Sequence, residues 1–130
     1  MENRGYSATI EEVVGVELTK KQIVLITTAD DSTPLDAYVE QNGEFIIDDI
    51  AGYVKVAIHN EKAKGDKDYS KYIILTNSGE SFSTGSESFM NTFANIISDM
   101  EGESEPWGVK VFRKPSKNYS GKYFLTCAIV

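Results

Sequence analysis

The residues of this chain that could do chemistry gather near its C-terminal end, where cationic side chains alternate with aromatic ones. Residues 106–130 contain five Lys or Arg and no Asp or Glu. The five rings among them are those of Trp107, Phe112, Tyr119, Tyr123 and Phe124. Cations can meet phosphates and rings can stack on bases, and the two together are what sequence-tolerant binding of a single nucleic-acid strand requires.

The remainder of the chain is acidic, so the charge is segregated along the sequence. The whole chain has a net charge of −7, although residues 106–130 carry only positive charges. A negative total argues against a nucleic-acid partner, because domains that bind nucleic acids are typically basic. A phosphate in a groove, however, responds mainly to charges within a Debye length, about 8 Å at physiological salt. The local distribution therefore weighs more than the total.

Catalytic chemistry has little support in the sequence. The only histidine, His59, ends an apolar run and has no partner at a recognisable metal-ligand or general-base spacing. The carboxylate pairs Asp30–Asp31 and Asp48–Asp49, with Asp36, lack the spacing of a calcium loop and suit turns and surface positions. The sequence has neither a phosphate-binding glycine loop nor a nucleophile-elbow pattern. We therefore expect no catalytic residue, no metal site and no cofactor.

The single cysteine and the N-terminal residues indicate the cellular setting. Cys127 lies in the apolar run of residues 124–130, so we expect it in the core and not as a reactive thiol. The first residues lack the apolar stretch of a signal peptide, and no segment has the length of a membrane span. These features predict a cytoplasmic protein without membrane contacts.

One helix stands out among the elements that must position the basic and aromatic residues. Apolar residues recur at helical spacing from Phe89 to Met100, which predicts a helix at about residues 85–101. Thr84 and Glu87 have the spacing of a capping box at its start, and a glycine follows its end.

Five strands are predicted around this helix, three before it and two after it. They fall at residues 53–60, 69–77, 80–83, 107–112 and 122–130. The lysine-rich segments 61–68 and 113–121 are expected to close hairpins. An order of three strands, a helix and two strands is that of the five-stranded OB-fold barrel, whose loops 1–2 and 4–5 flank the binding face. The sequence therefore predicts a mainly β protein with an OB-fold barrel at residues 51–130.

Residues 1–50 are expected to form an N-terminal extension packed on this barrel. Residues 23–26 have the pattern of a strand, residues 33–36 that of a turn or helix start, and residues 45–47 that of a further short strand. The extension could cover a sheet edge or make a contact in a homodimer, and the sequence does not choose between these roles.

Strand alternation indicates which side chains could meet a ligand. Lys71 and Tyr72 fall on opposite faces of the second predicted strand. Val109 and Val111 suit a core, so Lys110 and Phe112 should face outward. The residues predicted to bind phosphates are Lys62, Lys64, Lys67, Lys71, Lys110, Arg113, Lys114, Lys117 and Lys122, and those predicted to stack on bases are Tyr72, Trp107, Phe112 and Tyr119.

Two segments carry a resemblance to a known family. Residues 82–89 (FSTGSESF) and 114–124 (KPSKNYSGKYF) resemble single-stranded DNA-binding proteins encoded by bacteriophages and mobile elements of Gram-positive bacteria. The resemblance covers roughly residues 50–130 and is weak before them. It implies an OB fold, coating of single-stranded DNA during replication and recombination in the host cytoplasm, and no catalytic activity. Replication or recombination proteins would then be partners.

The chain departs from the bacterial housekeeping relatives of that family at its end. Those relatives end in a flexible acidic tail that recruits other replication proteins, whereas this chain ends in the apolar residues 125–130. The acidic N-terminal extension could recruit partners instead.

Rival functions stay open at this stage. A protein-interaction module, such as an acidic phage-encoded inhibitor that mimics DNA, would use the carboxylate-rich part and ignore oligonucleotides. A metal-dependent nuclease would use the Asp pairs and require magnesium. RNA is also left open as the ligand, because stacking and phosphate contacts do not read the sugar.

Overall fold

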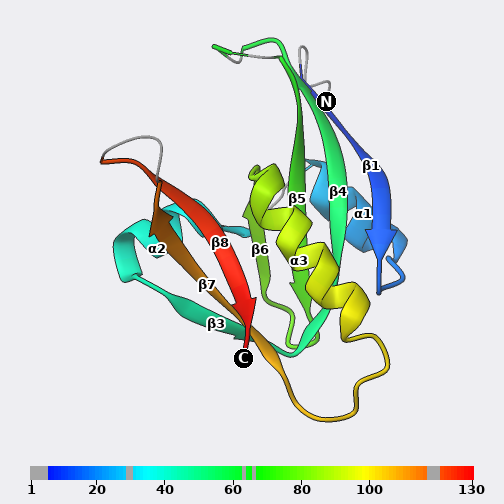
Figure 1. Cartoon of the computed structure of the whole chain (residues 1–130). Helices are drawn as coiled ribbons and strands as arrows, with labels where there is room; N and C mark the ends of the chain where they lie inside the picture. Colours follow the sequence, from blue (N-terminus) through cyan, green and yellow to red (C-terminus); the bar gives the residue numbers. More distant parts are fainter. Residues whose placement is uncertain (1–5, 29–30, 63, 66, 117–120) are drawn as a thin grey trace.

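The computed structural model of the chain describes residues 6–28, 31–62, 64–65, 67–116 and 121–130. Within them the protein is mainly β, with two sheets and three helices (Figure 1). The mainly β class predicted from the sequence is confirmed. No helix in the described part of the chain is long and apolar enough to cross a membrane.

The larger sheet has five strands. Their order across the sheet is β1 (Tyr6–Val14), β4 (Ile50–Asn60), β5 (Asp68–Thr76), β6 (Ser81–Thr84) and β2 (Thr33–Pro34). Neighbouring strands pair antiparallel except β2, which runs parallel to β6. The long hairpin of β4 and β5 projects beyond the rest of the sheet (Figure 1).

The smaller sheet has three antiparallel strands, in the order β3 (Phe45–Asp48), β7 (Gly108–Pro115) and β8 (Tyr123–Ile129). Only Asp49 separates β3 from β4, and its φ of 55° turns the chain from one sheet into the other. Asn77 holds this bend, because its backbone N–H and its side-chain amide donate to the Asp49 carbonyl and to the Asp49 carboxylate, both at 2.9 Å.

The main core lies between the two sheets and α3 (Glu87–Asp99). Phe89 and Phe93 of this helix are fully buried, and the Phe93 ring centre lies 5.8 Å from that of Tyr53 in β4. Val109 and Val111 of the smaller sheet are also fully buried in this cluster. The apolar stripe of the helix therefore joins both sheets, as its periodicity indicates.

A second apolar cluster lies on the opposite face of the larger sheet. It is made by Val54, Val56, Ile58 and Ile73. Leu18 and Ile26, before and within α1 (Lys20–Thr28), pack against it, and α1 lies behind β4 in Figure 1. Both faces of the larger sheet are thus partly covered, by α3 on one side and by α1 on the other.

The predicted strands around α3 and the helix itself are confirmed, but the residue that caps the helix is not the predicted one. All five strands and the helix lie within three residues of their predicted bounds. The helix is capped by Ser86, whose Oγ accepts a hydrogen bond from the Phe89 backbone N–H at 3.2 Å. Thr84 instead accepts from the Ser86 backbone N–H at 3.1 Å, so the predicted capping box of Thr84 and Glu87 is wrong.

The strand predicted at residues 23–26 is also wrong, because these residues lie in α1. Helix α1 starts with a capping box. The Thr19 backbone N–H donates to Gln22 Oε1 at 2.8 Å, and the Gln22 backbone N–H donates to Thr19 Oγ1 at 3.2 Å. This spacing is a sequence signal for a helix start, and it outweighs the short apolar run that indicated a strand. The helix start expected at residues 33–36 is confirmed by α2 (Leu35–Asn42), and the short strand at residues 45–47 by β3.

Within the described residues neither sheet closes into a barrel. The outer edge of β6 is taken by the two residues of β2, and β8 forms an edge of the smaller sheet. The first fifty residues supply β1 and β3 to the two sheets, where they pair with β4 and β7. The fold is therefore two sheets that β3 and β4 connect through the bend at Asp49.

Candidate nucleic-acid interface

The outward face of β7 carries a phenylalanine between two lysines. Val109 and Val111 point into the core, which turns Lys110 and Phe112 outward and confirms the predicted alternation. Lys110 Nζ lies 5.1 Å from the Phe112 ring centre, and Lys114 Nζ lies 5.8 Å from it. These distances fall in the range of cation–π contacts. A base stacked on Phe112 would have an amine on either side for its phosphates. Lys110 Nζ also lies 3.6 Å from Glu44 Oε2, an exposed ion pair that a phosphate would have to displace.

The partner strand β8 adds two rings that the predicted interface lacked. Phe124 pairs with Lys114 in the β7–β8 register, so both lie on the outward face, and Phe124 is 43% exposed. On the other face of the hairpin the Arg113 guanidinium lies 4.9 Å from the centre of the Tyr123 ring, which is 58% exposed. These ring–cation pairs depend on how β7 and β8 are aligned with each other. The sequence of either strand alone does not give this alignment.

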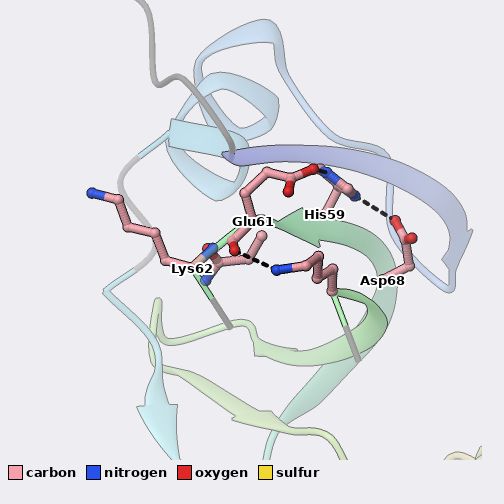
Figure 2. Close-up of polar contacts among 6 residues, drawn as sticks. His59, Glu61, Lys62 and Asp68 are labelled. Carbon is pink, nitrogen blue, oxygen red and sulfur yellow. Dashed lines mark hydrogen bonds and ion pairs between the residues drawn. The ribbon is translucent and has the colours of Figure 1, made fainter. Parts of the chain in front are cut away.

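The β4–β5 hairpin forms the second arm and carries three of the predicted lysines, although residues 61–68 contain as many carboxylates as lysines. The side chains of Lys62, Lys64 and Lys67 are exposed. Lys67 Nζ donates to the backbone carbonyl of Glu61 at 2.6 Å, which ties the end of the loop to its start. Figure 2 shows the Lys62 side chain pointing away from these contacts. The arm thus presents amines beyond the core, at the same end of the molecule as the end of β7 and the start of β8 (Figure 1).

A histidine held by two carboxylates forms the base of this arm (Figure 2). His59 Nδ1 lies 2.7 Å from Asp68 Oδ1, and His59 Nε2 lies 2.6 Å from Glu61 Oε1. Neutral imidazole has one N–H, so two such contacts require the imidazolium. The hydrogen bond to Asp68, and then that to Glu61, raises the pKa of His59 above its ordinary value. The sequence had indicated no partner for His59, because one of its partners comes from across the hairpin.

This cluster makes stability depend on pH. The folded pKa of His59 lies above the ordinary 6.5, so the stabilisation is fully present below pH 6.5 and is lost as pH rises through the folded pKa. We expect the free energy of unfolding in urea to fall as pH rises above 6.5, and to fall more for the natural chain than for His59→Gln. Identical pH profiles for the two chains would show that the cluster does not stabilise the fold.

The remaining predicted lysines among the described residues are Lys71 and Lys122. Lys71 is half-buried on β5, on the face opposite Tyr72, as alternation predicts. Lys122 is exposed just before β8, and its backbone carbonyl accepts from Ser116 N at 2.9 Å, which closes the β7–β8 hairpin. Lys117 and Tyr119 lie outside the described residues, so their roles stay predictions.

Tyr72 does not belong to an interface. Its side chain is only 7% exposed and packs in the main core, and its hydroxyl donates to Glu87 Oε2 at 3.1 Å. Burial, together with that hydrogen bond, raises the pKa of Tyr72 to about 12. The prediction that its ring stacks on a base is wrong, because α3 covers the face of the sheet on which it lies.

Trp107 lies at the wrong end of β7 for the predicted role. It is half-buried and borders a hollow lined by Asp48, Asp49 and Glu105. Trp107 precedes β7 by one residue, and five residue steps place it roughly 17 Å from Phe112. Carboxylates repel phosphates, so we correct the prediction and remove Trp107 from the interface. No segment of the sequence signalled this, because Asp48 and Asp49 come from a distant strand.

Two further kinds of site were considered in the sequence, a reactive thiol and a metal site. Cys127 is buried in the main core, as predicted, and burial raises the pKa of its thiol to about 11. A raised thiol pKa lowers the fraction of reactive thiolate. Among the described residues, no group of three or more His, Cys, Asp or Glu side chains could hold a metal ion.

Comparison with known proteins adds no relative: no family model, no curated protein and no solved structure matches the chain. Its function must therefore be argued from its own residues.

Proposed function

We propose that this protein binds single-stranded DNA with little sequence preference and protects it during replication or recombination, as a phage-encoded protein would. The observation that carries the proposal is the position of Phe112 between Lys110 and Lys114 on an outward sheet face. Every base has a face that can stack on such a ring, and every nucleotide has a phosphate for the adjacent amines. Such contacts hold a strand without reading its sequence.

Single strands suit this surface better than duplexes do. In a duplex the bases are already stacked and show only their edges, so a ring on a flat sheet face meets no base face. Phe124 extends the same surface along β8, beside Lys114 of β7, and Tyr123 with Arg113 repeats the pairing of ring and cation on the other face of the hairpin. RNA would satisfy the same contacts, so poly-uridine serves as a second ligand in the test.

The arrangement of the two arms supports an OB-like interface. Counted from β4, the order is three strands, α3 and two strands, and the two lysine-bearing hairpins take the places of loops 1–2 and 4–5. In OB folds these loops flank the binding face. We therefore infer an OB-related architecture opened between β6 and β8, where β2 occupies the edge that another strand would need.

Titration of a labelled poly-thymine strand, followed by fluorescence anisotropy, tests the proposal. We expect binding that weakens between about 50 and 200 mM salt, and much weaker binding of a duplex of the same length. Lys110→Ala with Lys114→Ala should flatten the slope of log affinity against log salt by about 1.4, since each phosphate contact on a single strand contributes about 0.7.

The matched control is Lys21→Ala with Lys55→Ala, which removes the same charge away from the arms. An equal change in slope for both pairs would show a general charge effect and remove Lys110 and Lys114 from the interface. Absence of oligonucleotide binding at low salt would overturn the proposal and leave the protein-interaction module as the better function.

A further inference from the structure

Two hollows lie side by side around Trp107. The first, of about 420 Å³, opens between the end of β1, the start of β4 and the C-terminal half of α3. Its wall is largely apolar and includes Val14 and Ile97, so we call it the apolar hollow. The second, of about 470 Å³, lies between the bend at Asp49 and the segment that leads into β7. Ile50 and Trp107 line both hollows, which makes them two parts of one surface.

The second hollow is acidic, and we call it the acidic hollow. Asp48, Asp49 and Glu105 line it, and Glu101 stands on the wall of the apolar hollow beside it. The Asp49 carboxylate is held in place, because its Oδ1 accepts a hydrogen bond from the Asn77 side-chain amide at 2.9 Å. No Lys, Arg or His is among the described residues that line either hollow. A cation that enters the acidic hollow therefore meets carboxylates without a competing positive charge on its walls.

The Trp107 ring adds a second attraction for a cation. It is half-buried, so part of the ring is accessible from the hollows. The face of an indole ring attracts ammonium and guanidinium groups more strongly than other aromatic rings do. Tryptophan is also among the residues that contribute most to protein–protein contacts. The surface therefore suits a ligand that carries an apolar group beside a positive charge.

The pairing of the two hollows fits an extended peptide. Such a peptide places the side chains of residues i and i+2 on the same side, about 7 Å apart. Two adjacent hollows match two such side chains, whereas a small organic cation occupies only one of them. We propose that this surface binds an extended segment of a partner protein, in which a bulky apolar residue enters the apolar hollow and a Lys or Arg two positions away enters the acidic hollow. Burial of the apolar side chain supplies most of the affinity, and the charges select which segments bind.

This peptide site lies away from the proposed nucleic-acid interface. Trp107 is roughly 17 Å from Phe112, and the start of β7 lies at the opposite end of the smaller sheet from the β7–β8 hairpin (Figure 1). The two surfaces also have opposite charge, so the carboxylates of the hollow repel the phosphates that the lysines of the arms attract. The inference thus goes beyond the proposed function, because it gives the chain a separate surface for a basic partner protein.

Fluorescence titration tests the inference directly, because Trp107 is the only tryptophan of the chain. The probe is a blocked Lys-Ser-Leu-Ser-Lys peptide, which has a cation two positions from its leucine in either direction. We expect a saturable blue shift of the emission with a Kd of about 100 µM or below, since the leucine displaces water from beside the indole ring. Lys-Ser-Ala-Ser-Lys lacks the apolar anchor and Glu-Ser-Leu-Ser-Glu sets carboxylates against carboxylates, so each should bind about tenfold more weakly or worse.

Ser98→Phe tests the apolar hollow from an exposed position of α3. Ser98 lines this hollow, so the new ring should fill its mouth and raise the Kd of the leucine peptide by about tenfold or more. The matched control is Asn95→Phe, which adds the same ring to the same helix at an exposed position outside the lining. It should leave the Kd within about twofold, because it does not occupy the hollow.

Glu101→Lys with Glu105→Lys tests the acidic side of the surface. This reversal should raise the Kd of the leucine peptide by about tenfold or more, because it sets lysines against the lysines of the peptide. Asp31→Lys with Glu40→Lys is the control, since it makes the same change of net charge at exposed residues that line neither hollow. Far-UV circular dichroism checks that each variant is folded.

Three results would overturn the inference. The first is unchanged Trp107 emission with the leucine peptide up to about 1 mM. The second is equal binding of the leucine peptide by the natural chain and by Ser98→Phe. The third is binding of benzyltrimethylammonium as tight as that of the peptide, because a single small cation then suffices. None of these results bears on strand binding, since the titration contains no oligonucleotide and no residue of the arms is changed.

Discussion

Replacing Phe112 and Phe124 together by alanine is expected to weaken binding of a poly-thymine strand by about 30-fold or more. One productive stack contributes about 1–3 kcal/mol by alanine substitution, and two stacks contribute at least about 2 kcal/mol if they add. Phe124 is 43% exposed and Phe112 is half-buried on the outward face, so the fold should lose little stability. Anisotropy titration gives the affinity, and urea unfolding checks the fold.

Ile129→Ala is the matched control for this double substitution. Ile129 lies on the same strand, is 46% exposed and has no ring, and it pairs with Val109 at the far end of the sheet. Its replacement should leave affinity within about twofold, because it offers no surface for stacking. If the double variant and the control bind equally well, both rings are ordinary surface residues and the stacking part of the proposed function fails.

Phe93→Ala is expected to lower the free energy of unfolding by about 3–5 kcal/mol. The ring is fully buried, and its centre lies 5.8 Å from that of Tyr53 and 5.9 Å from that of Phe89. Removing it leaves a cavity where α3 joins the two sheets. Domains of this size have about 5–15 kcal/mol of stability in all, so the loss would be a large fraction.

Urea denaturation of Phe93→Ala beside Phe112→Ala measures this effect with a ring of the same chemistry as control. Phe112 lies on the outward face of β7, so its loss should cost about 1 kcal/mol or less. A cost for Phe93→Ala as small as that for Phe112→Ala would show that α3 does not join the two sheets in solution. Loss of oligonucleotide binding by Phe93→Ala bears on the proposed function only under conditions where this variant is folded.

Local patterns predicted the parts of the candidate interface that depend on one strand or one loop. The alternation of Val109, Lys110, Val111 and Phe112 correctly predicted which side chains point inward, because a strand places successive residues on opposite faces. The polar segments around Lys62 and Lys114 correctly predicted hairpins, since such segments cannot be buried between strands.

Local patterns did not predict which residues are accessible to a ligand where a distant segment of the chain covers one face of a strand. Alternation placed Tyr72 opposite Lys71, but it could not tell that α3 lies over the Tyr72 side. It likewise could not show that the carboxylates Asp48 and Asp49 come to lie beside Trp107. The sequence did not predict Phe124 and Tyr123 as base-stacking residues. The cation beside each ring belongs to the neighbouring strand, β7, so alternation along β8 alone does not reveal it.

The sequence by itself determined the mainly β class, the α3 stripe, the strands around it and the cationic, aromatic character of residues 106–130. These features depend on hydrogen-bond geometry and side-chain periodicity within a few residues, which any folded context preserves. Only the tertiary structure decided that the sheets stay open, that His59 bridges two carboxylates and that α3 covers the Tyr72 face of the larger sheet. These features depend on which distant segments meet, because burial free energy is shared over the whole core and no short run of residues contains it.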